Sequence, residues 1–228
     1  MVTARTSEKA TDSLASLERR TGAKVFVPEV ADLSAPITIE ALADRLRDAA
    51  SPIDLLILNA GMVSGAKPRR DAQGIELTFS STIVAHHRLT VRLLNDQSLA
   101  PNARIIIVGS EVARGDVPMT SVIDVEAFAT KATGGNLVEA IKRIAKAEGP
   151  GKFRANDAYA TAKACVAWWT AALAQRLPAG MTVNAISPGL TPSTNNGRNM
   201  PWIARVIIPR MMKLLGMSGE FCRKLIRW

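Results

Sequence analysis

The sequence predicts an α/β fold: a doubly wound parallel sheet in one domain over 1–228, incomplete at its N-terminus. Two observations support this fold class. Continuous apolar runs at 53–58 (IDLLIL) and 104–108 (RIIIV) are typical of strands covered on both faces of a parallel sheet. These runs alternate with stretches of helical periodicity, as in βαβ units. A chain of 228 residues is also long enough for one sizeable core.

The elements follow in order from caps and periodicity. Ser7 precedes a helical stretch over 8–20, and Gly22 ends it as a C-terminal cap. Apolar residues recur every three to four positions from Ile39 to Leu46, marking a second helix that ends near residue 50. The other expected elements are a β-rich run at 24–30, helices at 75–94, 137–147 and 159–177, and a strand at 181–186.

The composition excludes several classes of protein. Hydrophobic residues make up 47% of the chain and charged residues 21%, which is ordinary for a globular protein. Cys165 and Cys222 are the only cysteines, so we expect no disulfide framework and no Cys-rich metal site. No apolar run approaches the roughly 20 residues of a membrane-spanning helix, and the opening residues lack a secretion signal. We therefore expect a cytoplasmic protein.

The net charge of +9 is concentrated near the C-terminus. From Arg198 onward there are seven basic residues and one acid, within a segment over 190–228 that we call the basic tail. No helix-turn-helix, zinc or RNP pattern accompanies it, and aromatic residues are only 4%, so we expect no nucleic-acid binding. Weak contact of the tail with a membrane surface is an open alternative.

His86 and His87 do not suggest a metal site. They are adjacent, and adjacent residues do not share a face of a helix. No cluster of Asp, Glu or Cys accompanies them. We interpret both as packing or polar-surface residues and expect no metal.

Small and polar residues follow three of the predicted strands. Asn59-Ala60-Gly61, Gly109-Ser110 and Ser187-Pro188-Gly189 each come directly after one strand. Any one of them is most simply explained as turn chemistry. The carboxyl ends of parallel strands meet at one edge of a sheet, where ligands bind in open α/β folds. Together the three segments predict a ligand site at this edge.

Tyr159 and Lys163 form the sharpest pattern in the chain. Their i, i+4 spacing places both side chains on one face of a helix. A Tyr hydroxyl has an ordinary pKa near 10 and is a poor acid or base at neutral pH. An ammonium held nearby lowers that pKa and makes the hydroxyl usable for proton transfer. Tyr159 is the only tyrosine in the chain, although an exposed helical pair is the simpler alternative.

On these motifs the sequence resembles the short-chain dehydrogenase/reductase family over essentially its whole length. The matching stretches occur in the family's order: LNAG at 58–61, GIELTFSSTIVAHHRLT at 74–90, RIIIVGS at 104–110, YATAK at 159–163 and VNAISPG at 183–189. The resemblance implies a Rossmann-like fold. It also implies an NAD(P)-dependent oxidoreductase that interconverts an alcohol and a carbonyl on a small apolar molecule.

The resemblance further implies a role for each matching residue. Tyr159 is the implied proton donor and acceptor, Lys163 holds the nicotinamide ribose and lowers the Tyr pKa, and Ser110 binds the substrate oxygen. The other implied cofactor contacts are Asn59, Ala60, Gly61, Pro188, Gly189 and Thr191, with Glu29 and Val30 beside the adenine. The basic tail is the implied substrate lid, and a complete chain is expected to form a homo-oligomer.

Arg5 bears on the choice of cofactor. It follows the end of a short strand, where a basic residue in this family favours NADP because a guanidinium pairs with the 2′-phosphate. Members that prefer NAD place an acid near this point, and none occurs between Val2 and Thr6. We therefore expect NADP rather than NAD.

Three features depart from the family pattern. Thr82 stands where the family has a catalytic Asn, and 48 residues (111–158) separate Ser110 from Tyr159. The TGxxxGxG phosphate loop is missing, so no helix N-terminus is evident for the pyrophosphate. These departures leave two alternatives open. One is a catalytically impaired fragment or pseudoenzyme of the family, and the other is a basic surface-binding protein acting through its tail.

The missing loop also leads us to expect a chain truncated at its N-terminus. The family's sheet has the strand order 3-2-1-4-5-6, and the loop directly follows the central first strand. We expect this chain to open at the end of the second strand, and we consider an early C-terminal end as well. The expected consequence is a gap or distortion beside the strand at 53–58, with an exposed apolar edge prone to aggregation.

Overall fold

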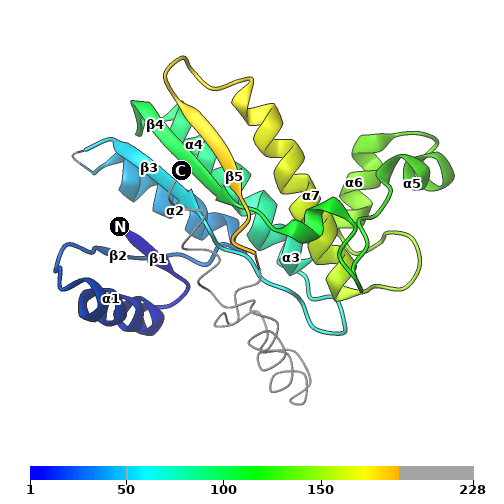
Figure 1. The fold of residues 1–228 in the computed structure, drawn as a ribbon, viewed down its shortest axis with the longest axis horizontal. Helices are drawn as coiled ribbons and strands as arrows, with labels where there is room; N and C mark the ends of the chain where they lie inside the picture. The colour runs from blue at the N-terminus through cyan, green and yellow to red at the C-terminus, as the bar shows by residue number, and fades with distance from the viewer. Residues whose placement is uncertain (50, 190–228) are drawn as a thin grey trace.

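The fold consists of parallel strands alternating with helices (Figure 1). The computed structural model describes residues 1–49 and 51–189. The first half contains β1 (Val2–Ala4), α1 (Ser7–Thr21), β2 (Pro28–Val30), α2 (Pro36–Arg47), β3 (Ile53–Leu58), α3 (Leu77–Phe79), the π-helical η1 (Ser80–Val84) and α4 (Ala85–Asn95). The second half contains β4 (Leu99–Val108), the 3₁₀ turn η2 (Glu111–Arg114), α5 (Val125–Ala132), α6 (Leu137–Ala145), α7 (Ala155–Ala174) and β5 (Thr182–Ile186).

The strands form two separate parallel sheets. One contains β1 and β2, and the other has the order β3-β4-β5. In the larger sheet Leu58 pairs with Ile107, and Val108 pairs with Ile186, so the three strands end at a common edge. This arrangement confirms the expected parallel α/β class and brings together the segments that follow β3, β4 and β5.

The main core lies between the β3-β4-β5 sheet and the helices α2, α4 and α7, which lie behind that sheet in Figure 1. Ile105 and Ile107 of β4 are fully buried against this layer, as are Leu42 of α2 and Leu93 of α4. A second, smaller core joins α5 and α6 to the end of α3 and the first half of α7. No helix in the described part of the chain is both long enough and apolar enough to cross a membrane.

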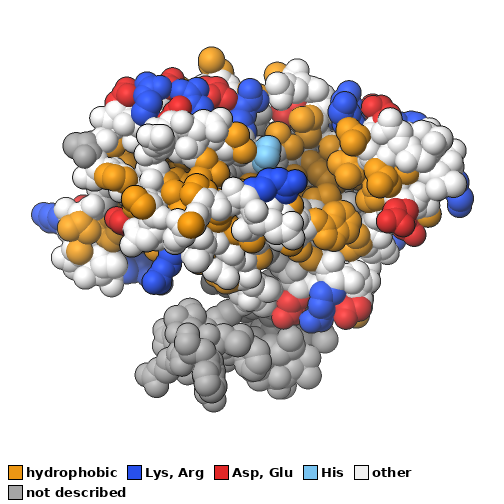
Figure 2. Space-filling model, turned by 90° about the horizontal axis from the view of Figure 1, so that it is seen from above, with side chains coloured by type: hydrophobic (Ala, Val, Ile, Leu, Met, Phe, Trp, Pro, Cys, Tyr) orange, Lys and Arg blue, Asp and Glu red, His pale blue; other side chains and the backbone are white. Residues whose placement is uncertain are grey.

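The expected gap beside β3 is present. Among the described residues, no strand pairs with the free edge of β3, and β1 and β2 belong to a different sheet. The opposite face of the larger sheet is also open, because alternate residues of β3 remain accessible: Leu55 is 52% exposed and Ile57 is 58% exposed. Figure 2 views the molecule from above relative to Figure 1. Hydrophobic side chains gather across the middle of this upper face, and most charged side chains lie towards its rim.

Several boundaries differ from the sequence prediction. The helix expected at 75–94 is interrupted by the π-helical turn η1, which periodicity does not indicate. Residues 111–157 were expected to contain one helical patch, yet they also contain α5, which Asp124 caps by accepting from the Ala127 N–H. The helix carrying Tyr159 begins four residues earlier, at Ala155. The β-rich run at 24–30 contributes only Pro28–Val30 to a strand.

The open face of β3 leads to a prediction about solubility. Ile57→Thr should reduce self-association while changing the free energy of unfolding by less than about 0.5 kcal/mol, because the side chain is mostly in water already. The matched variant Ile107→Thr, in the buried layer, should destabilise the protein by roughly 2–4 kcal/mol. Sedimentation velocity and urea denaturation measure the two effects, and equal destabilisation by both variants would contradict the open face.

Candidate active site

Lys163 lies at the centre of the candidate site. It is carried by α7 and is only 3% exposed, and its Nζ donates a 2.6 Å hydrogen bond to the backbone carbonyl of Val108 at the end of β4. The Nζ also lies 5.7 Å from the centroid of the Tyr159 ring, one turn earlier on the same helix. The i, i+4 spacing therefore places both side chains at the carboxyl edge of the sheet, as predicted.

Ser110 joins this pair directly. It follows β4 and caps η2 in an extended conformation, and its side chain hydrogen-bonds with Tyr159. Burial raises the pKa of the Tyr159 phenol, and the bond with Ser110 opposes this rise. Burial also lowers the pKa of the Lys163 ammonium to about 8. We expected Lys163 to lower the pKa of Tyr159, but the pKa is raised because burial of the phenol is the larger effect. The Lys163 ammonium donates its hydrogen bond to the Val108 carbonyl instead.

A cavity of about 120 Å³ opens beside these residues. Its lining comes from the ends of β4 and β5 and from α7: Gly109, Ser110, Ala113, Lys163, Val166, Ala167, Ala185, Ile186 and Ser187. Gly109 keeps the two strand ends close, since its N–H donates to the Ile186 carbonyl at 2.7 Å. A cavity of about 150 Å³ admits a benzene ring in other proteins. At about 120 Å³ this cavity is somewhat smaller than that, so it suits a small group rather than a large ring system.

The segment after β3 lies on the other side of Lys163. A Cβ atom placed on Gly61 would lie 3.3 Å from Thr82 Oγ1 and 3.8 Å from Lys163 Nζ. Thr82, on the π-helical turn η1, is fully buried at this point. Asn59 and Gly61 are exposed and Ala60 is half-buried. The structure thus brings Gly61, from one of the three strand-end motifs, next to Lys163. It also places Thr82 there, which those motifs did not predict.

Glu29 lies on β2 of the smaller sheet and Arg5 directly follows β1, both away from Tyr159 (Figure 1). Arg5 is exposed and pairs with Asp32 at 3.8 Å, an acid that sequence reasoning missed. Burial disfavours the Asp32 carboxylate, but hydrogen bonds from the Ser34 hydroxyl and N–H, together with Arg5, lower its pKa overall. The Asp-x-Ser pattern after β2 could have indicated this turn. Glu29 accepts a 2.8 Å bond from Arg45, which also binds the Val30 carbonyl.

The residues after β5 are only partly described. Pro188 and Gly189 continue from Ser187 at the edge of the cavity, and Gly189 adopts a positive φ of 70°. Thr191 and the basic tail lie outside the described residues. The proposed lid and the membrane-surface alternative therefore have no structural description here.

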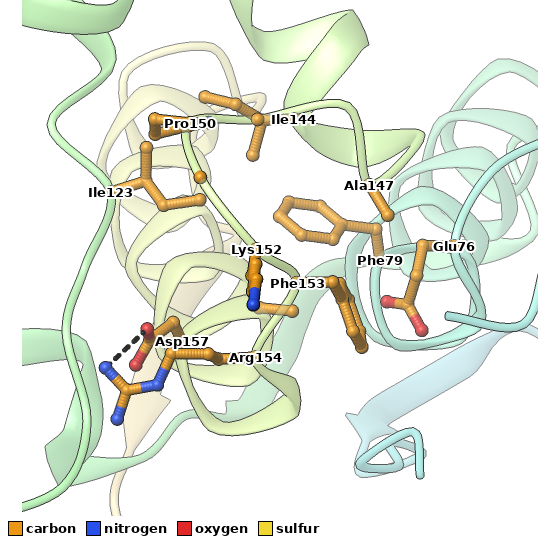
Figure 3. Close-up of a pocket in the computed structure, with 13 residues that line it drawn as sticks. Glu76, Phe79, Ile123, Ile144, Ala147, Pro150, Lys152, Phe153, Arg154 and Asp157 are labelled. Carbon is orange, nitrogen blue, oxygen red and sulfur yellow. Dashed lines mark ion pairs between the residues drawn. The ribbon is translucent and has the colours of Figure 1, made fainter. Parts of the chain in front are cut away.

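The insertion before Tyr159 forms its own compact unit. Helices α5 and α6 pack on the start of α7, and a separate cavity of about 60 Å³ opens among them (Figure 3). In this view the rings of Phe79 and Phe153 lie near Glu76, whose carboxylate is buried and accepts from Ser64 and Thr78. The lining of this cavity does not include Tyr159, Ser110 or Lys163, so it is distinct from the candidate active site.

The two histidines differ in their surroundings. His86 is 2% exposed within α4, whereas His87 is exposed and meets Trp169 of α7 edge-on, with ring centroids 5.8 Å apart. Within residues 1–49 and 51–189, no three His, Cys, Asp or Glu side chains gather as metal ligands would.

Comparisons with known proteins agree with this architecture. Residues 1–142 match the family described as short chain dehydrogenase. Over 196 residues the chain is 26% identical to a protochlorophyllide reductase of Avena sativa, covering 81% of this chain and 61% of that protein. Over 178 residues it is 28% identical to a WW domain-containing oxidoreductase of Drosophila melanogaster, covering 77% and 38% respectively. The chain thus spans less than two thirds of either relative.

Solved structures show the same fold. An actinorhodin polyketide ketoreductase with NADPH aligns with a TM-score of 0.61 at 21% identity, covering 90% of this chain and 66% of that one. Other similar structures hold NADP or NAD. The family match spans more than half of the sequence and agrees with the parallel sheets and the strand-end site. The chain belongs to the short chain dehydrogenase family.

Proposed function

We propose that this chain is an NADP-dependent oxidoreductase that interconverts an alcohol and a carbonyl on a small apolar molecule. The observation that carries the proposal is the convergence of Tyr159, Ser110 and Lys163 at the carboxyl edge of the sheet, beside a cavity of about 120 Å³. The relatives named as a reductase and an oxidoreductase support the same class of reaction.

Each of the three side chains has a separate role in the proposed proton transfer. In reduction, the Ser110 hydroxyl orients the substrate oxygen, and Tyr159 donates its phenolic proton to that oxygen. In oxidation, the phenolate of Tyr159 accepts the proton of the substrate hydroxyl. Burial disfavours the phenolate left after donation, and the hydrogen bond from Ser110 opposes this effect. In the proposed reaction the Lys163 ammonium, 5.7 Å from the centroid of the Tyr159 ring, is the cation that would offset the new charge, although it does not lower the Tyr159 pKa in the free protein. A bound nicotinamide supplies or accepts the hydride at the substrate carbon.

The described residues fit the nicotinamide end of the cofactor better than they fit its pyrophosphate. Lys163 and the cavity bounded by Gly109 and Ile186 suit the nicotinamide and its ribose, and Asn59–Gly61 offer small residues for close approach. For the pyrophosphate, the described residues provide no Gly-rich turn leading from a strand into a helix N-terminus. This disagreement favours the alternative of a catalytically impaired member of the family.

Arg5 supports NADP over NAD within this proposal. Its side chain is 54% exposed, and the 3.8 Å distance from its Nε to Asp32 Oδ1 is too long for a hydrogen bond, so its N–H donors can bind a phosphate. Asp32 opposes the preference, because a carboxylate at this edge is the group that binds ribose hydroxyls in NAD-dependent proteins. Apolar walls from Val166 and Ile186 favour an apolar substrate. We also propose that the protein forms a homo-oligomer and is located in the cytoplasm.

Replacing the proton donor tests the reaction. Tyr159→Phe should lower turnover of a panel of small apolar ketones by roughly 10²–10⁴-fold, because the phenyl ring keeps the packing and removes the acid. Trp168→Phe, half exposed on the same helix, serves as the matched control and should keep its turnover. Circular dichroism checks that both variants fold. Unchanged turnover in Tyr159→Phe would rule out this residue as the proton donor.

A second prediction concerns the cofactor. Arg5→Ala should weaken NADPH binding by roughly tenfold and leave NADH binding unchanged, because one charge-assisted contact with the 2′-phosphate is lost. Arg47→Ala, whose guanidinium pairs with Asp44 and Asp48 on α2, is the control and should bind both cofactors as before. Titration followed by NADPH fluorescence measures the affinities. A chain that gives no saturable signal at millimolar cofactor would instead support the impaired family member.

A further inference from the structure

Three buried polar side chains meet where the β3 segment, which comprises residues 59–65 directly after β3, reaches the start of α3. Ser64 is 1% exposed, and Glu76 and Thr78 are fully buried. The Glu76 carboxylate accepts from the Ser64 hydroxyl, from the Thr78 N–H at 3.0 Å and from the Thr78 hydroxyl at 3.2 Å. The Ser64 N–H in turn donates to Thr78 Oγ1 at 3.3 Å. These bonds join two segments that are separate in the sequence.

The burial of Glu76 depends on these hydrogen bonds. A carboxylate that is removed from water is costly unless its oxygens find donors. No Lys, Arg or His in the described part of the chain makes an ion pair with Glu76. Ser64 therefore supplies a substantial share of what stabilises the buried carboxylate.

Capping of α3 does not by itself account for Glu76. Its side chain accepts from the Thr78 N–H, as that of a helix N-cap does, but the short side chains of Ser, Thr, Asp and Asn are preferred at this position. The longer glutamate side chain also reaches Ser64, twelve residues earlier in the chain. The bond to Ser64 is additional to the cap, and it ties the β3 segment to α3.

The backbone of Glu76 is fixed independently of this bond. Its N–H donates to the Ala145 carbonyl at the end of α6 at 2.8 Å, and Glu76 forms a β-bridge with Arg70. Arg70 Nε donates to the Lys146 carbonyl at 2.9 Å. Figure 3 shows Glu76 near the ring of Phe153, at the cavity within the insertion. Glu76 thus lies between the insertion and the β3 segment and is held by the insertion.

The β3 segment carries the residues expected to approach the cofactor. At its start Leu58 is paired with β4, and Ser64 is a second fixed point near its end. Asn59–Gly61 lies between these two points, and a Cβ on Gly61 would lie 3.8 Å from Lys163 Nζ. The position of this backbone relative to Lys163 is therefore fixed from both sides.

We propose that Glu76 is a positioning residue for the cofactor, which holds the β3 segment beside Lys163 through its bond to Ser64. The β3 segment has no regular secondary structure, so side-chain hydrogen bonds fix it in place of a helix or a strand ladder. Glu76 takes no part in proton transfer. Its effect on cofactor affinity rests on the proposed function, whereas its hold on the β3 segment is a property of the free protein.

Amide hydrogen exchange in the whole chain, without cofactor, tests the hold on the β3 segment. Ser64→Ala should speed exchange of the amides at 61–65 by roughly tenfold, because a hydrogen bond to a carboxylate is lost. Glu76→Ala should speed it at least as much. Glu76→Gln should restore most of the protection, because its amide oxygen still accepts from the Ser64 hydroxyl.

Asp71→Asn is the matched control. Asp71 accepts from the Gln73 and Ile75 N–H groups in the turn just before Glu76, so its replacement perturbs the same region. It should leave exchange at 61–65 unchanged. In all variants the amides of β4 should keep their protection, which distinguishes local release of the β3 segment from general destabilisation.

Cofactor binding is the second readout. Ser64→Ala and Glu76→Ala should each weaken NADPH binding by roughly tenfold, and Glu76→Gln should bind more tightly than Glu76→Ala. In turnover the loss should raise the KM for NADPH and leave kcat unchanged, because the groups that transfer the proton are untouched. Asp71→Asn should keep both constants.

Three outcomes would overturn the inference. They are unchanged exchange at 61–65 in Ser64→Ala, equal acceleration in Asp71→Asn or throughout β4, and faster exchange at 61–65 with unaltered NADPH affinity. If Glu76→Ala does not fold, Ser64→Ala and Glu76→Gln decide. A wild-type chain that binds no NADPH would contradict the proposed function, whereas the exchange rates would still decide whether Glu76 holds the β3 segment.

Discussion

The site depends on one hydrogen bond, from the buried Lys163 ammonium to the backbone carbonyl of Val108. A charged group that is 3% exposed must have partners in the protein, and this bond ties the middle of α7 to the end of β4. Small residues surround Lys163 on this helix and are buried with it, among them Ala160, Ala162 and Ala164. Once Lys163 is fixed, the position of Tyr159 one turn away follows from the helix geometry.

The two faces of the β3-β4-β5 sheet are covered to different extents. The side of β3-β4-β5 that faces α2, α4 and α7 is packed, while Leu55 and Ile57 on the other side stay exposed. The candidate active site lies where the packed layer meets the ends of β4 and β5, so its geometry does not require the open edge of β3. Arg5 follows β1 of the smaller sheet, which is not paired with the sheet that carries the cavity. Binding of an extended cofactor therefore depends on how these two sheets are held together.

Much of the fold could be predicted because strand burial and helix periodicity are local signals. The run at 53–58 is a strand with the predicted bounds, and YATAK lies on a helix beside Ser110. The missed features depend on contacts between distant segments. Asp32 meets Arg5 only after the β1-β2 pair forms, and the direction of the Tyr159 pKa depends on burial by neighbouring elements. The π-helical turn that contains the buried Thr82 has only five residues, which is too short to leave a periodic pattern in the sequence.

Transfer of isotope from cofactor to substrate tests the central claim most directly. The purified chain is incubated with NADPH that carries deuterium at the transferable position, together with small apolar ketones, and the alcohols are analysed by mass spectrometry. The account predicts deuterium on the carbinol carbon of at least one product, at a level that falls to background in Tyr159→Phe. Bound cofactor with no deuterated alcohol from any ketone, or equal labelling by the Tyr159→Phe variant, would contradict it.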